Sequence, residues 1–211
     1  MRDVMTPVPG PPGELTRDGD LSIRLIRDEA AEFERLVSWR KEPHVREWWD
    51  TDEPPLTVES AVAEYRQDLG PGAPTTACII ELSGKPVGYL QFYRWASYPS
   101  EAREIGIPEN KGTWGLDIFM GDRSLIGGGV GSRALDLLCR YLFEAEQASA
   151  VALCTALGNT RAQRAYEKAG FVKVRQVLDT DTRGGKRVRS WLMVRERSSH
   201  DAAPRQLGSA E

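Results

Sequence analysis

The segment Leu125-Ile126-Gly127-Gly128-Gly129-Val130-Gly131-Ser132 decides the fold, because it joins a predicted strand to a long predicted helix. Four glycines in five positions let the backbone turn tightly and bring several N–H groups towards one point. The N-terminus of the following helix adds partial positive charge, so the segment can cradle a phosphate. The alternative is a merely flexible turn.

Two familiar phosphate-binding motifs do not fit this glycine loop. A P-loop requires Gly-Lys followed by Ser or Thr, and Gly131-Ser132-Arg133 contains no lysine. A dinucleotide fingerprint that begins at Gly127 requires Gly or Ala where Ser132 stands, and it normally follows the first strand of its unit. A ligand with a diphosphate held by backbone amides alone remains, and coenzyme A is one such ligand.

Hydrophobic periodicity on both sides of the loop predicts strands mixed with helices. The expected strands are 21–26, 75–82, 87–95, 114–120, 150–155, 171–178 and 187–195, with a Ser83-Gly84 turn in the first hairpin. The expected helices are one capped by Asp28, one capped by Thr57, and two at 131–146 and 159–169, the last stopped by Gly170. This order predicts an α/β fold, a sheet with helices on its faces.

Length and composition are consistent with one domain. The chain has 211 residues, 40% of them hydrophobic, and a net charge of −3, which argues against nucleic acid as a partner. No apolar run reaches the roughly 18–20 residues that cross a bilayer, and no secretory signal is recognised. We expect a flexible leader at 1–20, a domain at 21–197 and a disordered tail at 198–211.

The cysteines and histidines bear on compartment and metal binding. Cys78, Cys139 and Cys154 are an odd number in hydrophobic surroundings, which favours free thiols in a reducing, cytoplasmic compartment. His44 and His200 are far apart and no Cys/His ligand spacing occurs, so we expect no metal site.

Three segments in order resemble the GCN5-related N-acetyltransferase (GNAT) family. They are 126–131, Asn159-Thr160-Arg161-Ala162 and Tyr166-Glu167-Lys168-Ala169-Gly170-Phe171, although Ile126 stands where that family usually has Gln or Arg. The resemblance implies the GNAT fold, with a central mixed, mostly antiparallel sheet flanked by helices on both faces. It also implies acetyl-CoA as the acetyl donor, with direct attack by an amine and without a metal.

The same resemblance implies roles for individual residues. The strand residues Ile118, Phe119 and Met120 would hold the acetyl carbonyl and pantetheine arm through their backbone. The cofactor-binding loop would comprise Ile126, Gly127, Gly128, Gly129, Val130, Gly131 and Ser132. Tyr166 would protonate the departing thiolate and contact the cofactor, the alternative being a core residue. Asn159 would bind the pantetheine arm or act only as a helix N-cap.

The acceptor is suggested by the segment 44–49, His-Val-Arg-Glu-Trp-Trp, and by Asp117, which resemble the bacterial aminoglycoside 6′-N-acetyltransferases over roughly residues 21–195. Tryptophans beside acidic residues suit a cationic amino sugar, with Asp117 as a base or substrate anchor. The expected substrate-binding residues are Trp48, Trp49, Asp50, Glu101, Glu104, Asp117 and Asp179. The alternative for Glu101 and Glu104 is a charged, solvated loop, and the alternative for Asp117 is a solvated strand-end aspartate or a structural partner for an arginine.

Several points stay open at this level. Cys154 stands where those resistance enzymes carry an acidic residue, which puts the drug range in doubt. The alternatives are a siderophore-type hydroxylysine N-acyltransferase and a coenzyme-binding regulatory domain without turnover. The basic residues Arg183, Lys186, Arg187 and Arg189 either meet the 3′-phosphate of the coenzyme or form a solvated hairpin. We expect a monomer or homodimer, without a membrane partner.

Overall fold

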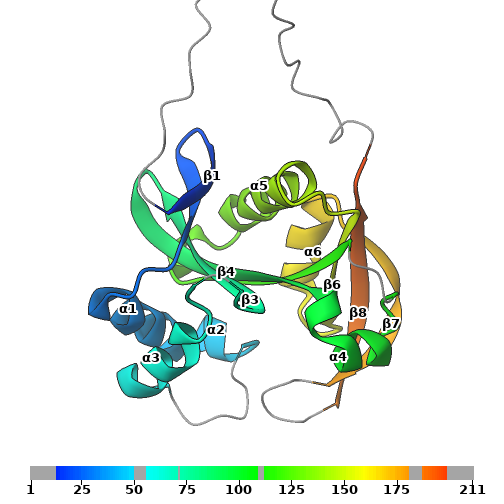
Figure 1. Ribbon diagram of the computed structural model, residues 1–211, viewed down its shortest axis with the longest axis horizontal. Helices are drawn as coiled ribbons and strands as arrows, with labels where there is room; N and C mark the ends of the chain where they lie inside the picture. The colour runs from blue at the N-terminus through cyan, green and yellow to red at the C-terminus, as the bar shows by residue number, and fades with distance from the viewer. Residues whose placement is uncertain (1–12, 50–55, 71, 109–111, 181–186, 199–211) are drawn as a thin grey trace, which may run out of the picture.

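The computed structural model describes residues 13–49, 56–70, 72–108, 112–180 and 187–198. Eight strands of this part form one sheet in the order β1-β2-β3-β4-β5-β6-β8-β7, with helices on both faces (Figure 1). All neighbouring strands run antiparallel except β5 and β6, which are parallel. The prediction of a mixed, mostly antiparallel sheet between helices is therefore confirmed.

Most elements lie close to their predicted positions, but three short ones, at 14–18, 43–46 and 99–104, were not predicted. The strands are β1 (Glu14–Asp18), β2 (Leu21–Leu25), β3 (Thr75–Leu82), β4 (Lys85–Arg94), β5 (Thr113–Met120), β6 (Ala150–Ala156), β7 (Val172–Thr180) and β8 (Arg187–Glu196). The α-helices are α1 (Ala30–Lys41), α2 (Pro43–Arg46), α3 (Val58–Arg66), α4 (Pro99–Glu104), α5 (Val130–Glu144) and α6 (Thr160–Lys168). None of these helices is long and apolar enough to cross a membrane.

Strand β1 lies inside the segment that was expected to be a flexible leader. It pairs antiparallel with β2, so ordered structure begins before residue 21. Its sequence, Glu-Leu-Thr-Arg-Asp, contains only one apolar residue, Leu15, which packs at the margin of the core. An edge strand that buries one side chain leaves too weak a periodic signal to be recognised. The other boundaries of leader, domain and tail remain predictions.

The helix ends follow local capping chemistry. The side chain of Thr57 accepts a hydrogen bond from the Ser60 amide at 3.1 Å, and Ser60 bonds back to Thr57, forming a capping box at α3. The Asn159 side chain accepts from the Ala162 amide at 3.1 Å and so begins α6. Gly170 follows α6 with φ +85°, a left-handed conformation that ends the helix. At α1 the N-cap is Glu29 rather than Asp28, one residue later than expected.

The two faces of the sheet carry separate hydrophobic cores. Helices α5 and α6 cover one face and α1 to α3 the other (Figure 1). A buried ion-pair network fastens α1 to the sheet: Arg24 on β2 contacts Glu32 on α1 at 2.8 Å and Glu81 on β3 at 2.7 Å. This attachment fixes the layer formed by α1 to α3, which carries the tryptophan pair Trp48 and Trp49.

Strands β5 and β6 separate soon after they begin. They pair only at Thr113–Ala150 and Trp114–Val151, although β5 continues to Met120 and β6 to Ala156. Meanwhile β5 stays paired with β4 along its length. Within the residues that the structure describes, one edge of β5 beyond Trp114 therefore has no neighbouring strand and faces a gap in the sheet.

Candidate functional site

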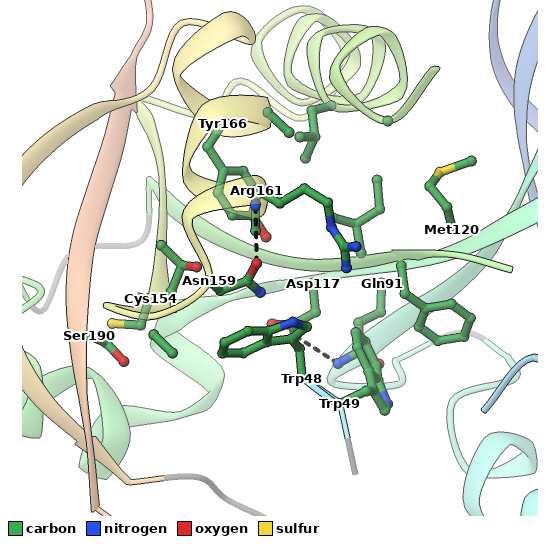
Figure 2. Close-up of a pocket in the computed structure, with 18 of the residues that line it drawn as sticks. Trp48, Trp49, Gln91, Asp117, Met120, Cys154, Asn159, Arg161, Tyr166 and Ser190 are labelled. Atoms are coloured by element: carbon green, nitrogen blue, oxygen red, sulfur yellow. Dashed lines mark hydrogen bonds between the residues drawn. The ribbon is translucent and has the colours of Figure 1, made fainter. Parts of the chain in front are cut away.

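One cavity of about 1290 Å³ opens where β5 and β6 separate (Figure 2). It collects residues that are distant in the sequence: from the segment after α2, from the glycine loop, from both diverging strands, and from α3, α4, α6 and β7. The predicted site residues that line it are Trp48, Trp49, Glu101, Glu104, Asp117, Ile118, Phe119, Met120, Ile126, Gly127, Gly129, Gly131, Ser132, Asn159, Tyr166 and Asp179. Asp50 lies outside the described residues.

The glycine loop presents open backbone at one end of this cavity. Gly127 and Gly129 have φ of +86° and +85°, and no atom lies within 4 Å of where a Cβ would stand on either. Gly129 is the N-cap of α5 and has no side chain that could cap the helix. The first backbone amides of α5 therefore remain available to a ligand. This arrangement fits a phosphate group.

Two residues of the loop do not line the cavity. The Gly128 amide donates to the Leu125 carbonyl at 3.2 Å, which closes the turn. The Val130 side chain is buried in the core beneath α5. Gly128 therefore contributes the shape of the loop, and Val130 can offer a ligand its backbone amide but not its side chain.

Three cations from α6 lie beside the cavity: Arg161, Arg164 and Lys168. For the basic cluster near residues 183–189 the sequence left two alternatives, the 3′-phosphate of the coenzyme or a solvated hairpin. Arg187 pairs with Glu104 at 2.9 Å, Arg189 bonds to Gln176, and neither lines the cavity, while Arg183 and Lys186 fall outside the described residues. Among the described lysines and arginines, those that line the cavity come from α6.

Asp117 lies in the middle of the cavity wall, on β5. Its Oδ2 accepts a hydrogen bond from Gln91 Nε2 at 2.8 Å, and Gln91 Oε1 accepts one from the Tyr89 hydroxyl at 2.8 Å (Figure 2). The pairing of β4 with β5 sets Gln91 directly opposite Asp117. Because the amide N–H only donates, this chain holds the carboxylate as a hydrogen-bond acceptor facing the cavity.

Tyr166 projects from α6 towards the same cavity, and its side chain is buried against Phe171. Burial raises the pKa of the phenol, and the Asp117 carboxylate raises it further. The hydroxyl therefore keeps its proton at neutral pH, which is the state that a proton donor needs. Burial likewise raises the pKa of the half-buried Cys154 thiol, with smaller effects from Asp179 and Asp117.

Aromatic and acidic residues form the opposite end of the cavity. Trp49 packs edge-on against Phe119, with ring centroids 4.8 Å apart, whereas Trp48 is 38% exposed and lies over Gly158. Glu101 and Asp179 add carboxylates from α4 and β7. Because Glu104 is paired with an arginine, it carries less uncompensated charge than the prediction assumed.

Helix α3 and the residues after it form one wall of the cavity, and this wall was not predicted from the sequence. Glu64, Gln67 and Asp68 recur at helical spacing and line the cavity together. Arg40, which is buried, holds the Glu64 carboxylate at 2.9 Å. A polar stripe along a capped helix was visible in the sequence, but only the fold shows which way it faces.

The whole arrangement has an anion-binding end, a cation-binding end, and a carboxylate with a phenol between them. No group of three or more His, Cys, Asp or Glu residues in the described part is placed to hold a metal ion. A family model described as an acetyltransferase (GNAT) domain matches residues 28–178. The chain belongs to the GNAT acetyltransferase family. It is an acetyltransferase, and its sheet and helices are those of the GNAT fold.

Relatives within the GNAT family are similar over most of their length. The aminoglycoside N(6′)-acetyltransferase type 1 of Klebsiella pneumoniae is 25% identical over 177 residues, which is 79% of this chain and 82% of the relative. A structure of aminoglycoside acetyltransferase AAC(6′)-Ib with coenzyme A and kanamycin is 25% identical, with TM-score 0.68, and covers 84% of this chain and 95% of that one. The same enzyme with ribostamycin and coenzyme A gives TM-score 0.71 at 24% identity, covering 90% and 99%.

Proposed function

We propose that this GNAT enzyme transfers the acetyl group of acetyl-CoA to an amino group of an aminoglycoside, the 6′ amine, and so confers resistance to the antibiotic. The observation that carries the proposal is the division of charge along one cavity. Open amides and the α6 cations occupy one end, and acidic and aromatic side chains occupy the other. The aminoglycoside N(6′)-acetyltransferases similar to this chain support the choice of acceptor.

The donor fits the gap between β5 and β6. Acetyl-CoA supplies the activated thioester when it is bound. The loop and the first turn of α5 would hold its pyrophosphate through the backbone amides from Gly129 to Ser132. On the edge of β5 that faces the gap, Ile118 and the Met120 amide offer backbone groups to an extended arm. The predicted backbone contact of Phe119 is not available there, because its carbonyl points to β4, and the Met120 carbonyl is bonded to His44. Asn159 Oδ1 already accepts a hydrogen bond from the Ala162 amide of its own helix, and its amide nitrogen can donate to such an arm.

Asp117 is the proposed anchor and proton acceptor for the amine. An amine attacks a thioester only when it is neutral, so the proton of the bound ammonium group must leave first. The carboxylate is held in place by Gln91 and already faces the cavity. An ammonium group that binds to Asp117 therefore loses its proton there, either directly or through a water molecule.

Tyr166 is the proposed acid for the leaving group. A thiol such as that of coenzyme A has an ordinary pKa near 8.5, well below that of a buried phenol. Because full proton transfer from this phenol to a free thiolate is uphill, Tyr166 would donate a hydrogen bond to the sulfur while negative charge develops there, and its proton would move only as the C–S bond breaks. Reprotonation from solvent restores the phenol for the next turnover.

The acidic and aromatic end accounts for the proposed acceptor class. Trp48 and Trp49 provide flat apolar contact. Carboxylates that line the same end, Asp68, Glu101 and Asp179, provide countercharge for ammonium groups, whereas the charge of Glu64 is already balanced by Arg40. Cys154 contributes no charge at its position, so the drug range is expected to differ from that of relatives with a carboxylate there. A cytoplasmic location, and assembly as a monomer or homodimer, belong to this proposal.

A thiol-release assay tests the function. Purified enzyme with acetyl-CoA is offered kanamycin-type and ribostamycin-type aminoglycosides, lysine-type amines including hydroxylysine, and short peptides. We expect turnover with the aminoglycosides, and mass spectrometry or NMR of the product should place the acetyl group on the 6′ nitrogen. Turnover confined to hydroxylated lysine would contradict the proposed acceptor. Tight coenzyme binding without turnover on any amine would contradict the proposed reaction and favour a regulatory role.

A further inference from the structure

His44 is a buried residue of α2 that lies between the end of β5 and the tryptophan pair. Its side chain is 8% exposed and borders the cavity. Its Nε2 lies 2.9 Å from the carbonyl oxygen of Met120, the last residue of β5. A carbonyl only accepts hydrogen bonds, so Nε2 carries the proton and the ring is a donor here. The other nitrogen, Nδ1, is buried without a hydrogen-bond partner in the described part of the chain.

The direction of the Met120 carbonyl follows from the geometry of the strand. Successive carbonyls of a strand point to opposite edges. The Phe119 oxygen lies on the β4 side, 2.7 Å from where a Cβ would stand on Gly88. The carbonyl of Met120 therefore points to the other edge, the one that faces the gap left by β6. His44 occupies the last acceptor of that open edge.

The same short helix touches both ends of the cavity. The His44 carbonyl accepts a long hydrogen bond, 3.4 Å, from Arg161 of α6. One turn later, the amides of Trp48 and Trp49 donate to the Val45 carbonyl at 3.0 and 2.9 Å. A contact between His44 and β5 therefore fixes the acceptor wall relative to the strand that the donor would follow.

We propose that His44 is a positioning residue that closes the open edge of β5 and sets the register in which the extended arm of the coenzyme pairs with it. This inference rests on the proposed use of acetyl-CoA. Residues of a strand repeat every ~3.4 Å, and equivalent backbone groups on one edge repeat at twice that spacing. A slip of one such step would carry the thioester several ångströms from Asp117 and Tyr166, whereas reaction needs atoms about 3–3.5 Å apart. Because the Met120 carbonyl already accepts the hydrogen bond from His44, an arm displaced by one such step would find no free acceptor at that position.

The first test compares two substitutions of similar size. His44→Leu removes the donor, and His44→Gln keeps an N–H group at a comparable distance from the backbone. We expect His44→Leu to lower kcat by about 10- to 100-fold, since small misplacements have such effects. The dissociation constant of coenzyme A, measured by calorimetry, should stay within about threefold, because the same number of backbone pairings can still form. His44→Gln should restore most of kcat.

A merely structural role for His44 predicts a different pattern. Coenzyme affinity, kcat and the melting temperature would then fall together, and His44→Gln would not rescue kcat selectively. Wild-type kcat in His44→Leu would also overturn the proposal. Failure of the unaltered enzyme to bind coenzyme A would instead contradict the proposed function, so the two failures are distinguishable.

A second measurement needs no substitution. Met120-Gly121 is the only Met-Gly pair in the sequence, so a sample with carbonyl-13C methionine and 15N glycine gives one carbonyl resonance in a carbonyl–amide correlation spectrum. We expect coenzyme A to leave this resonance in place, because the bond to His44 persists. A change in this carbonyl resonance showing that the coenzyme replaces His44 as the hydrogen-bond donor to Met120 would overturn the proposal. This result does not depend on whether His44→Leu folds.

Discussion

Gly131 offers a prediction in which stability and coenzyme affinity move in opposite directions. It is the second residue of α5, and a Cβ built on it meets only the Met120 side chain, at 3.8 Å, an ordinary contact. Gly131→Ala therefore adds no strain to the free enzyme. It removes conformational freedom from the unfolded chain and should raise the free energy of unfolding by about 0.4–1 kcal/mol. For a protein of this size the melting temperature should rise by about 1–4 °C.

The same methyl group should harm coenzyme binding. Gly131 lines the cavity at the turn where the helix amides are proposed to approach the pyrophosphate. A side chain there keeps the phosphate from the amides, and we expect the dissociation constant of coenzyme A to rise about tenfold or more, which corresponds to ~1.4 kcal/mol. Isothermal titration calorimetry measures this affinity, and differential scanning calorimetry measures stability on the same sample.

A donor without phosphates provides the control. S-acetyl pantetheine shares the arm and thioester of acetyl-CoA but lacks the pyrophosphate. Gly131→Ala should leave kcat/KM for this donor nearly unchanged while lowering it for acetyl-CoA. Unchanged coenzyme affinity, or equal losses with both donors, would refute the assignment of the pyrophosphate to the first turn of α5.

Three further outcomes follow from contacts in the site and core. Asp117→Asn should lower kcat by about 10²- to 10⁴-fold in the thiol-release assay, because the amide cannot accept the ammonium proton, while calorimetry shows unaltered coenzyme affinity. Since burial raises the pKa of Tyr166, the native state keeps a proton that the unfolded chain releases above about pH 10, and stability is lost as pH rises. Urea unfolding between pH 9 and 11 should therefore show a steeper loss for the wild type than for Tyr166→Phe, and parallel curves would contradict the burial of this phenol. Glu32→Gln should lower the free energy of unfolding by about 3 kcal/mol, measured by urea titration, because it breaks a buried ion pair of Arg24; a change below ~1 kcal/mol would show that Glu81 alone suffices.

Much of the fold could be predicted because its signals are local. The Ser83-Gly84 turn, the Thr57 cap and Gly170 each dictate a backbone conformation through their own side chain or its absence. The glycine loop is also a local signal, since its four glycines and the start of the following helix are adjacent in the sequence. Strand β1 was missed because an edge strand with one buried side chain gives no period to recognise.

The acceptor end was only partly predictable, because it depends on orientation. Trp49 and Asp117 were recognised by resemblance to a family, and both line the cavity. The stripe of Glu64 and Asp68 was missed, since a polar helix face reads as solvated until a neighbouring surface is known. The role of Arg187 stayed open for the complementary reason: its partner, Glu104, is 83 residues away in the chain. Ion pairs of this kind are set by the tertiary structure and have no sequence signature.

The separate origins of the two ends of the cavity bear on how such an enzyme can evolve. The anion-binding end is made of backbone and one helix from the second half of the chain, where substitutions are constrained by turn geometry. The cation-binding end is made of side chains from α3, α4 and β7 that project from surface elements. Changes in the range of acceptors can therefore accumulate on those elements one residue at a time, while the transfer chemistry is inherited unchanged.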